Sequence, residues 1–402
     1  MGNQFTAADV GYLGSAQGES ALAAAQEYSL TSATVLNDVA ALRPRYGDNT
    51  AALVETVRLR RRARAKLEGA ERWLFTDDAL QQATPTPVAR HRSRRLAGRA
   101  VHDVTCSIGA ELAALQAVCP VVIGSDLDRV RLSMARHNLS ATPNIALLRA
   151  DALQPCSAGT AIVADPARRA GGRRTHDPAD LQPPLPELLA AYRGRDLVVK
   201  CAPGLDFDRL TPPGPGGGDA GRAWDGEIEV TSLDGSVREA CLWSRGLTEA
   251  GVHRRATVLG GDGSSWSITD IESDDIPERE PGEWIIDPDG AIVRAGLVRH
   301  YAAGRGLWQL DPRIAYLTGD TVPPGVRGFR VLDRLTFREK ALRAELRRRD
   351  CGPLEILVRG VDIDPDALRR RLRPGGSTPH TVVITRIGST ATAFVCRTPP
   401  AR

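Results

Sequence analysis

Four apolar runs of this chain each end in an acidic residue, and this pattern restricts the fold more than any other feature. The first, Val101–Glu111 (VHDVTCSIGAE), passes through a small-residue turn into a helical pattern. The later runs end in GSDLD at 124–128, RADA at 149–152 and VADPARR at 163–169. In a doubly wound sheet, ligands bind at the carboxyl ends of the strands. The sequence therefore predicts an α/β fold with acids gathered at one edge of a parallel sheet.

The spacing of apolar residues predicts two kinds of domain. Three- and four-residue spacing through 1–75 indicates an N-terminal helical domain, in which Thr76 begins a further short helix. Strand–helix alternation then predicts a second domain over 76–283, entered through a connecting segment at 73–99. We expect residues 237–247 to turn between its last two strands. The expected strands lie near 100–105, 121–126, 145–149, 160–165, 196–201, 228–233 and 253–260.

The C-terminal third reads as a separate unit. Residues 262–283 are rich in acids and are expected to form a linker within the end of the second domain. A less regular connecting region follows at 284–325, and 326–402 predicts a small α+β domain. In that domain, Asp364 followed by proline is a typical helix start, and two apolar runs near the end predict a hairpin.

Composition excludes several classes of protein. No stretch approaches the ~20 apolar residues that a membrane span needs, and the first ten residues lack the charged lead and apolar core of a secretory signal. The seven cysteines include no CxxC pair, so the sequence indicates neither a disulfide framework nor a zinc site. We therefore expect a cytoplasmic protein with no membrane contact and no metal.

Taken together, the four motifs resemble the class I S-adenosylmethionine-dependent methyltransferases. The likeness extends to 73–98, to VKCAPGLD after 196, to EWIIDPDGAIVRAGLV at 283–298 and to LDPRIAYLTGD at 310–320. The tail, GPLEILVRGVDIDPDALRRRL with TVVITRIGSTATAFVCR, is similar to a THUMP-like domain. The whole chain thus resembles bacterial methyltransferases that end in such a domain. The resemblance implies a Rossmann-like seven-stranded sheet, S-adenosyl-L-methionine as cofactor and S-adenosyl-L-homocysteine as product.

The resemblance also implies which residues bind the cofactor. Asp126 would accept the ribose hydroxyls, Asp151 the adenine amino group, and Gln82 with Thr84 would close over the methionine end. Asp128 is expected to cap the next helix instead. Taken singly, each aspartate is more typical of a helix cap or a solvated loop acid, whereas the set of them after VHDVTCSIGAE favours cofactor binding. The expected cofactor-binding set is Gln82, Thr84, Asp103, Thr105, Cys106, Ser107, Gly109, Asp126, Leu127, Asp151 and Ala152.

VADPARR stands where base-methylating enzymes carry their catalytic motif, although here no aromatic residue follows Pro166. Asp165 could accept a hydrogen bond or a proton from a base nitrogen, and Arg168 could pair with phosphate. Lys200, one of three lysines in the chain, ends the next strand and is a candidate substrate contact. The predicted catalytic residues are therefore Asp165, Pro166, Arg168 and Lys200. The alternative is a Pro-terminated strand with solvated arginines, and we interpret Cys201 as a core residue.

The basic charge is concentrated in segments that suit RNA. Residues 58–99 carry twelve Arg or Lys against four acids. Within them, a stripe of arginines would border the cleft and contact RNA, or would form a solvated helix face in an arginine-rich bacterial proteome. The stripe comprises Arg90, Arg92, Arg94 and Arg95.

The predicted function is methylation of a base in tRNA or rRNA by direct transfer, with RNA bound through 58–99 and 327–373. Two alternatives stay open. One is a small-molecule or protein methyltransferase, and the other is an RNA-binding protein with a degenerate catalytic site.

Overall fold

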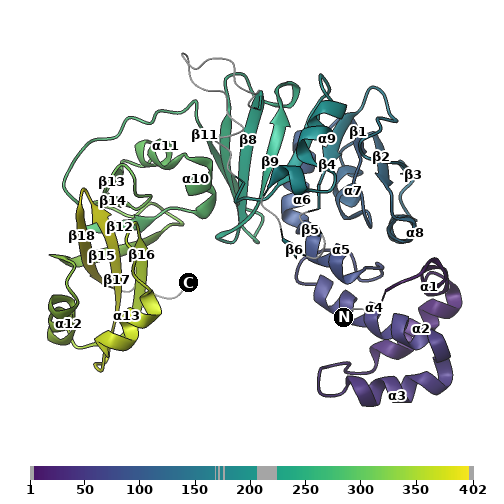
Figure 1. Cartoon of the computed structure of the whole chain (residues 1–402), viewed down its shortest axis with the longest axis horizontal. Helices are drawn as coiled ribbons and strands as arrows, with labels where there is room; N and C mark the ends of the chain where they lie inside the picture. The colour runs from purple at the N-terminus through teal and green to yellow at the C-terminus, as the bar shows by residue number, and fades with distance from the viewer. Residues whose placement is uncertain (1–3, 168, 171–172, 175–176, 206–223, 398–402) are drawn as a thin grey trace. The chain divides into compact units, whose positions relative to one another are not determined.

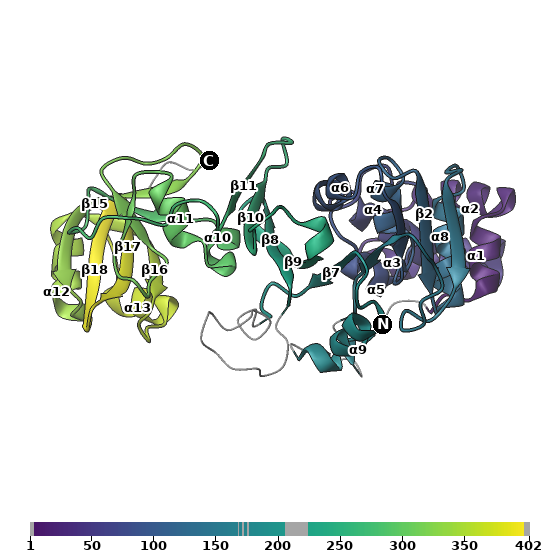
Figure 2. The ribbon, with the colours of Figure 1, turned by 90° about the horizontal axis from the view of Figure 1, so that it is seen from above.

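The computed structural model describes residues 4–167, 169–170, 173–174, 177–205 and 224–397. The chain divides into two compact units, whose elements are labelled in Figures 1 and 2. The first unit comprises Met1–Leu233, Arg238–Ala250 and Leu259–Ser264, and the second comprises Asp234–Val237, Gly251–Val258 and Ser265–Arg402. In the part of the chain that is described, no helix has both the length and the apolar character needed to cross a membrane.

The first unit begins with the helical region that the apolar spacing predicted. Its helices are α1 Ala7–Leu13, α2 Ala16–Gln26, α3 Val35–Tyr46, the 3₁₀ turn Gly47–Asn49 and α4 Thr50–Ala63. Leu13, Leu22 and Leu53 lie in their shared core, which also includes Met134 from a later helix. The Asn138 amide accepts a hydrogen bond from the Leu74 N–H at 2.7 Å and donates to the Leu74 carbonyl at 3.1 Å. The helical region is thereby attached to the sheet that follows.

Two short helices lead into the sheet: α5 Asp77–Gln82 and α6 Thr86–Arg95. The Thr76 hydroxyl accepts a hydrogen bond from the Ala79 N–H at 3.1 Å, so the expected helix cap is confirmed. Pro85 is the N-cap residue of α6, and Pro87 lies in its first turn, where a fixed φ and a missing N–H are compatible with a helix start.

The sheet of the first unit has the expected mostly parallel topology. This sheet has nine strands among the described residues, and those of the first unit follow the order β8-β9-β7-β4-β1-β2-β3. The pairs from β7 through β3 are parallel, whereas β9 is antiparallel to β7. The strands are β1 Ala100–Asp103, β2 Val121–Asp126, β3 Ile145–Arg149, β4 Ala161–Ala164, β7 Leu197–Cys201, β8 Gly226–Leu233 and β9 Ser236–Ser244. Other elements of this unit are α7 Ala110–Leu115, α8 Arg129–Asn138, α9 Leu185–Ala191, the hairpin β5 Arg169–Ala170 and β6 Arg173–Arg174, and the 3₁₀ turns Pro178–Asp180 and Arg245–Leu247.

The expected turn at 237–247 is wrong, because most of this segment forms strand β9. The dipeptide Asp234-Gly235 joins β8 to β9 with φ values of +51° and +72°. Two positive φ angles in a two-residue loop match the twist of a β-hairpin, and Asp-Gly is a preferred sequence for it. The strand expected at 253–260 does form, as β10 Arg254–Leu259, but β9 is the strand that pairs with β7.

The second unit is built on a sheet with the order β13-β14-β12-β15-β18-β17-β16. The segment 284–325, expected as a connecting region, supplies β12, β13 and β14 to this sheet, and β12 pairs with β15. The predicted final hairpin is confirmed as the antiparallel pair β17–β18. The elements are β11 Ser265–Thr269, β12 Trp284–Asp287, α10 Gly290–Ala295, α11 Val298–Ala303, β13 Trp308–Gln309, β14 Leu317–Gly319, β15 Arg327–Thr336, α12 Glu339–Arg348, β16 Cys351–Arg359, α13 Pro365–Leu372, β17 Thr378–Ile387 and β18 Thr390–Arg397.

Both faces of this second sheet are covered. Alternate residues of a strand point to opposite faces. Val382 accordingly packs in one core with Leu342 of α12 and Leu368 of α13, whereas Val383 packs with Phe329 on the other side. Figures 1 and 2 show both helices beside strands β16–β18. Asp364 caps α13 as expected, since its carboxylate accepts hydrogen bonds from the N–H groups of residues 366 and 367.

Substitution of Gly109, with Gly98 as the comparison, tests how tightly the turn between β1 and α7 is packed. Gly109 has φ +85°, and a Cβ there would lie 2.6 Å from Leu139 Cδ1, whereas Gly98 has φ +76° and open space around it. Gly98→Ala should cost only the left-handed backbone strain, about 1–2 kcal/mol. Gly109→Ala should cost roughly 1 kcal/mol more because of the added overlap. Urea denaturation of both variants measures the difference, and equal losses would contradict the close approach at Gly109.

Candidate active site

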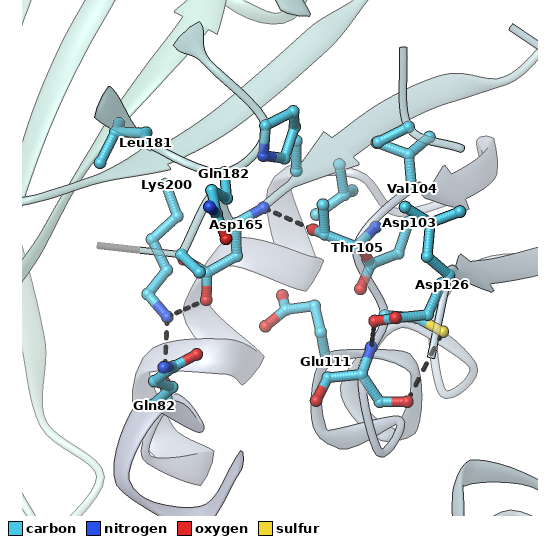
Figure 3. Close-up of a pocket in the computed structure, with 18 of the residues that line it drawn as sticks. Gln82, Asp103, Val104, Thr105, Glu111, Asp126, Asp165, Leu181, Gln182 and Lys200 are labelled. Carbon is cyan, nitrogen blue, oxygen red and sulfur yellow. Dashed lines mark hydrogen bonds and ion pairs between the residues drawn. The ribbon is translucent and has the colours of Figure 1, made fainter. Parts of the chain in front are cut away.

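A cavity of about 730 Å³ opens at the carboxyl ends of β1, β2, β4 and β7, where the sequence placed its acids (Figure 3). The turn after β1 forms one wall, and α5 with the following loop forms another. Twelve of the predicted site residues line this cavity: Gln82, Thr84, Asp103, Thr105, Cys106, Ser107, Asp126, Leu127, Asp151, Ala152, Asp165 and Lys200.

Three predicted residues are not among those that line the cavity. Gly109 instead allows the left-handed turn that begins α7. Pro166 is buried, and Ala167 beside it lines the cavity in its place. Arg168 lies outside the described residues.

The turn after β1 is held by the strands on both sides. The Val104 N–H donates to the Val163 carbonyl and the Cys106 N–H to the Ser125 carbonyl, each at 2.9 Å. Ser107 adopts φ +50°, so a serine takes a backbone conformation that usually favours glycine. Gly124 gives room for this turn, because a Cβ there would lie 3.1 Å from the Cys106 side chain.

Asp126 connects this turn to the end of β2. Its Oδ2 accepts a hydrogen bond from the Ser107 N–H at 3.0 Å and its Oδ1 from the Asp128 N–H at 2.8 Å. Asp128 caps α8 through the Val130 N–H, which confirms the expected role. Asp151 is exposed at the end of β3, and its Oδ1 accepts from the Leu153 N–H at 2.9 Å.

Asp103 is only 3% exposed and lies deep in the cavity wall. Its Oδ1 accepts hydrogen bonds from the Thr105 N–H at 3.0 Å and the Thr105 hydroxyl at 3.3 Å. Burial, reinforced by the nearby carboxylates of Glu111 and Asp165, raises the pKa of Asp103 to about 8. The Thr105 hydroxyl also accepts from the Asp165 N–H at 2.7 Å, so one side chain fixes the ends of β1 and β4.

Asp165 and Lys200 form an ion pair across the ends of β4 and β7 (Figure 3). The Lys200 side chain is 9% exposed, and its ammonium also donates to the Gln82 carbonyl at 3.3 Å. Lys66 donates to the carbonyls of Leu80 and Gln81 at 2.9 and 2.8 Å. Two of the three lysines therefore close the C-terminus of α5, where cations are favoured by the helix dipole.

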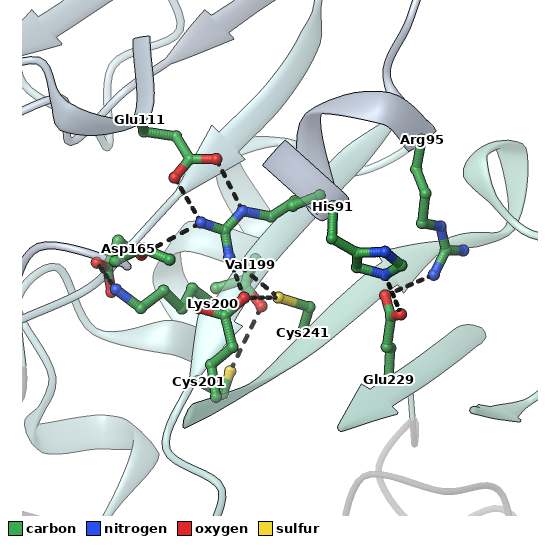
Figure 4. A network of polar contacts seen from close by, with 12 residues as sticks. His91, Arg95, Glu111, Asp165, Val199, Lys200, Cys201, Glu229 and Cys241 are labelled. Carbon is green, nitrogen blue, oxygen red and sulfur yellow. Dashed lines mark hydrogen bonds and ion pairs between the residues drawn. The ribbon is translucent and has the colours of Figure 1, made fainter. Parts of the chain in front are cut away.

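The arginine stripe of α6 is not the free surface that either interpretation of the sequence expected. Arg92 is 3% exposed and ion-paired with Glu111 and Glu239. Figure 4 shows Glu111 and, in the same network, the contact of Arg95 with Glu229. Arg95 pairs with Glu227 at 2.6 Å and with Glu229 at 2.7 Å. These two arginines are therefore unavailable to a nucleic acid backbone.

The rest of the stripe differs from these two positions. Arg90 forms an exposed pair with Glu68 at 2.6 Å, and Arg94 is exposed. Arg60 and Arg61, also within 58–99, donate to backbone carbonyls of neighbouring loops, including those of Trp73 and Tyr28. Many arginines of this segment therefore bind carboxylates or carbonyls of the protein itself.

Sequence reasoning missed a third wall of the cavity. Leu181, Gln182, Pro183 and Pro184 line it, and the Gln182 backbone pairs with Ala167 through hydrogen bonds of 2.8 and 3.0 Å. This pairing brings the segment before α9 next to Asp165. No spacing or residue type in the sequence marks it.

Comparison with known proteins decides the family. The chain is 58% identical over 367 residues to an S-adenosylmethionine-dependent methyltransferase of Mycobacterium tuberculosis, described as uncharacterized, in strains CDC 1551 and H37Rv. The match covers 89% of this chain and 99% of the relative. The chain belongs to the S-adenosylmethionine-dependent methyltransferases.

Further matches agree with this family. A crystal structure of a candidate methyltransferase from Porphyromonas gingivalis W83 is similar to this methyltransferase with a TM-score of 0.73 and 19% identity, over 99% of this chain and 100% of that chain. Residues 326–398 match the family model of the THUMP domain-like family, and residues 6–63 match a domain of unknown function, DUF8688. The predicted fold and the THUMP-like tail of the methyltransferase are therefore confirmed.

The raised pKa of Asp103 predicts a pH-dependent stability of the methyltransferase. A carboxyl whose pKa is raised by folding stabilises the native state fully below about pH 4, and this contribution is lost as the pH rises toward 8. Asp103→Asn should therefore raise the melting temperature at pH 8 by about 3–6 °C and change it little at pH 4. Scanning fluorimetry across this range is the measurement. Glu187→Gln, at an exposed carboxylate, is the control and should leave the dependence of melting temperature on pH unchanged. If the curve for Asp103→Asn runs parallel to that of the wild-type protein, Asp103 is ionised throughout this range.

Proposed function

We propose that the cavity binds S-adenosyl-L-methionine, with its adenosine along Asp151, Leu127 and Asp126. A volume of about 730 Å³ is within the usual range of small-molecule sites. Each oxygen of Asp126 accepts one backbone N–H, which leaves lone pairs for two ribose hydroxyls. The amino-acid end would lie along the turn after β1, with Gln82 and Thr84 from the opposite wall.

The ion pair of Asp165 and Lys200 carries the proposal for the reacting end. Both side chains line the cavity next to the turn after β1, and Asp165 is the more exposed partner, at 40%. An ionised carboxylate only accepts hydrogen bonds, so it would select a target with an N–H group and orient its nitrogen. Lys200 would hold the carboxylate in place and contact the substrate. With Arg168, whose role is assigned from sequence alone, these residues form the proposed substrate site.

The proposed chemistry is a direct in-line transfer in which the protein mainly positions the reactants. The bound cofactor would supply an electrophilic methyl group on a sulfonium. Asp165 would hold the target nitrogen and receive its proton where the nitrogen must lose one. The Thr105 hydroxyl, which binds the Asp165 N–H, would keep this carboxylate in register with the cofactor site.

The proposed substrate is a base of tRNA or rRNA. The match of 326–398 to a THUMP domain-like family supports RNA, as does the basic character of 327–373. Within this segment several exposed cations make no ion pair with a described residue, which leaves them available to phosphates. They are Arg338, Lys340, Arg347 and Arg373.

The test is transfer of a labelled methyl group to RNA from a strain that lacks this gene, followed by mass spectrometry of the nucleosides. Asp165→Asn should lower turnover by about 10²–10⁴-fold while keeping affinity for S-adenosylhomocysteine. Glu187→Gln, an exposed carboxylate on α9, is the control and should retain full activity. Full turnover by Asp165→Asn would overturn the catalytic role, and label only in protein or small molecules would overturn the RNA substrate.

A further inference from the structure

The contact between α6 and α7 is built on one buried guanidinium that two carboxylates share. Arg92 has two carboxylate partners, Glu111 and Glu239. Glu239 is 2% exposed and is sufficient to balance the guanidinium. Lys200 on the neighbouring strand β7 is already paired with Asp165. Two carboxylates thus share one guanidinium in a largely buried place, and a positively charged ligand group would be favoured beside Glu111, the more exposed of the two.

Glu111 is the carboxylate of this group that faces the cavity. It stands in the first turn of α7, lines the cavity, and has a side chain that is 12% exposed. Arg92 Nε donates to Glu111 Oε1 at 2.9 Å, and Arg92 Nη2 donates to Oε2. This two-point contact fixes the plane of the carboxylate. The same Nη2 contacts the Thr84 hydroxyl at 3.3 Å, which joins both walls around the proposed methionine end.

A second observation points to a ligand donor at this place. Asp103 is only 3% exposed, and it lines the same cavity. Its Oδ1 is occupied by Thr105, whereas its Oδ2 has no hydrogen-bond partner among the described residues. Figure 3 shows the side chains of Asp103 and Glu111 directed toward the same space. A group with several N–H donors and a positive charge would satisfy both.

We propose that Glu111 binds the α-ammonium group of the cofactor's amino-acid end, and that Arg92 is the positioning residue that holds Glu111 for this contact. This inference rests on the proposed cofactor site. The ammonium is a compact cation with three N–H donors, so it can contact Glu111 and the free oxygen of Asp103 together. Adenosine makes no use of this wall, because its proposed contacts lie at the ends of β2 and β3.

Glu111→Gln tests the contact with two ligands that differ only at this end. S-adenosylhomocysteine carries the amino-acid group, and 5′-methylthioadenosine keeps the adenosine and thioether without it. In calorimetric titrations, Glu111→Gln should weaken S-adenosylhomocysteine about 10- to 100-fold, because a charge-assisted hydrogen bond is lost. The affinity for 5′-methylthioadenosine should stay within about twofold of the wild-type value. Equal weakening of both ligands, or of neither, would overturn the role of Glu111.

Asp126→Asn separates this inference from the proposed cofactor site. The ribose is common to both ligands, so this variant should weaken both. If the wild-type protein binds neither ligand, the proposed site fails and the inference fails with it. If Asp126→Asn weakens both ligands and Glu111→Gln weakens neither, the site stands and only the role of Glu111 is overturned. Scanning fluorimetry confirms that each variant is folded.

The positioning role of Arg92 is tested by a double-mutant cycle. Arg92→Lys keeps the charge but loses the two-point contact, so it should weaken S-adenosylhomocysteine and spare 5′-methylthioadenosine. In the Glu111→Gln background the same substitution should have little further effect, since Arg92 acts through Glu111. A purely structural Arg92 would give an equal loss in both backgrounds and for both ligands, and this result would overturn its positioning role.

Discussion

The buried guanidinium of Arg92 is the interaction on which the site depends. It joins α6, which lies before the sheet, to the first turn of α7 through Glu111 and to β9 through Glu239. A charge buried to this extent must be paired, and removal of one partner of a buried pair typically costs about 3–5 kcal/mol. The arrangement of these three elements around the cavity is therefore coupled to one set of ion pairs.

The acids at the strand ends have different chemical environments although they occupy similar positions in the sequence. Asp128 is used as a helix cap, and Asp126 is oriented by two backbone N–H groups. Asp103 is buried, which raises its pKa to about 8, whereas Asp165 is partly exposed and paired with Lys200. One fold thus places a mostly neutral carboxyl and a paired carboxylate in the same cavity, because their environments differ.

Sequence reasoning was accurate where the relevant signal is local. The strand ends at Asp103, Asp126 and Asp165, and the caps at Thr76 and Asp364, depend on residues only a few positions apart, and the structure places them as expected. The hairpin at Asp234-Gly235 also has a local signal, but β9 lacks a clear polar alternation, so the sequence pattern predicts a turn where the strand lies. The fold and the position of the cavity were therefore predictable.

The sequence by itself determined the order of strands, turns and helix caps, and thereby the acids that reach one edge of the sheet. Only the tertiary structure decided how these charges are paired. Arg92 and Glu239 are 147 positions apart, and Lys200 meets Asp165 across 35 positions. Whether an arginine is solvated or a carboxyl stays neutral depends on burial and on such distant partners, because electrostatic energies follow distance in space and local dielectric rather than order along the chain.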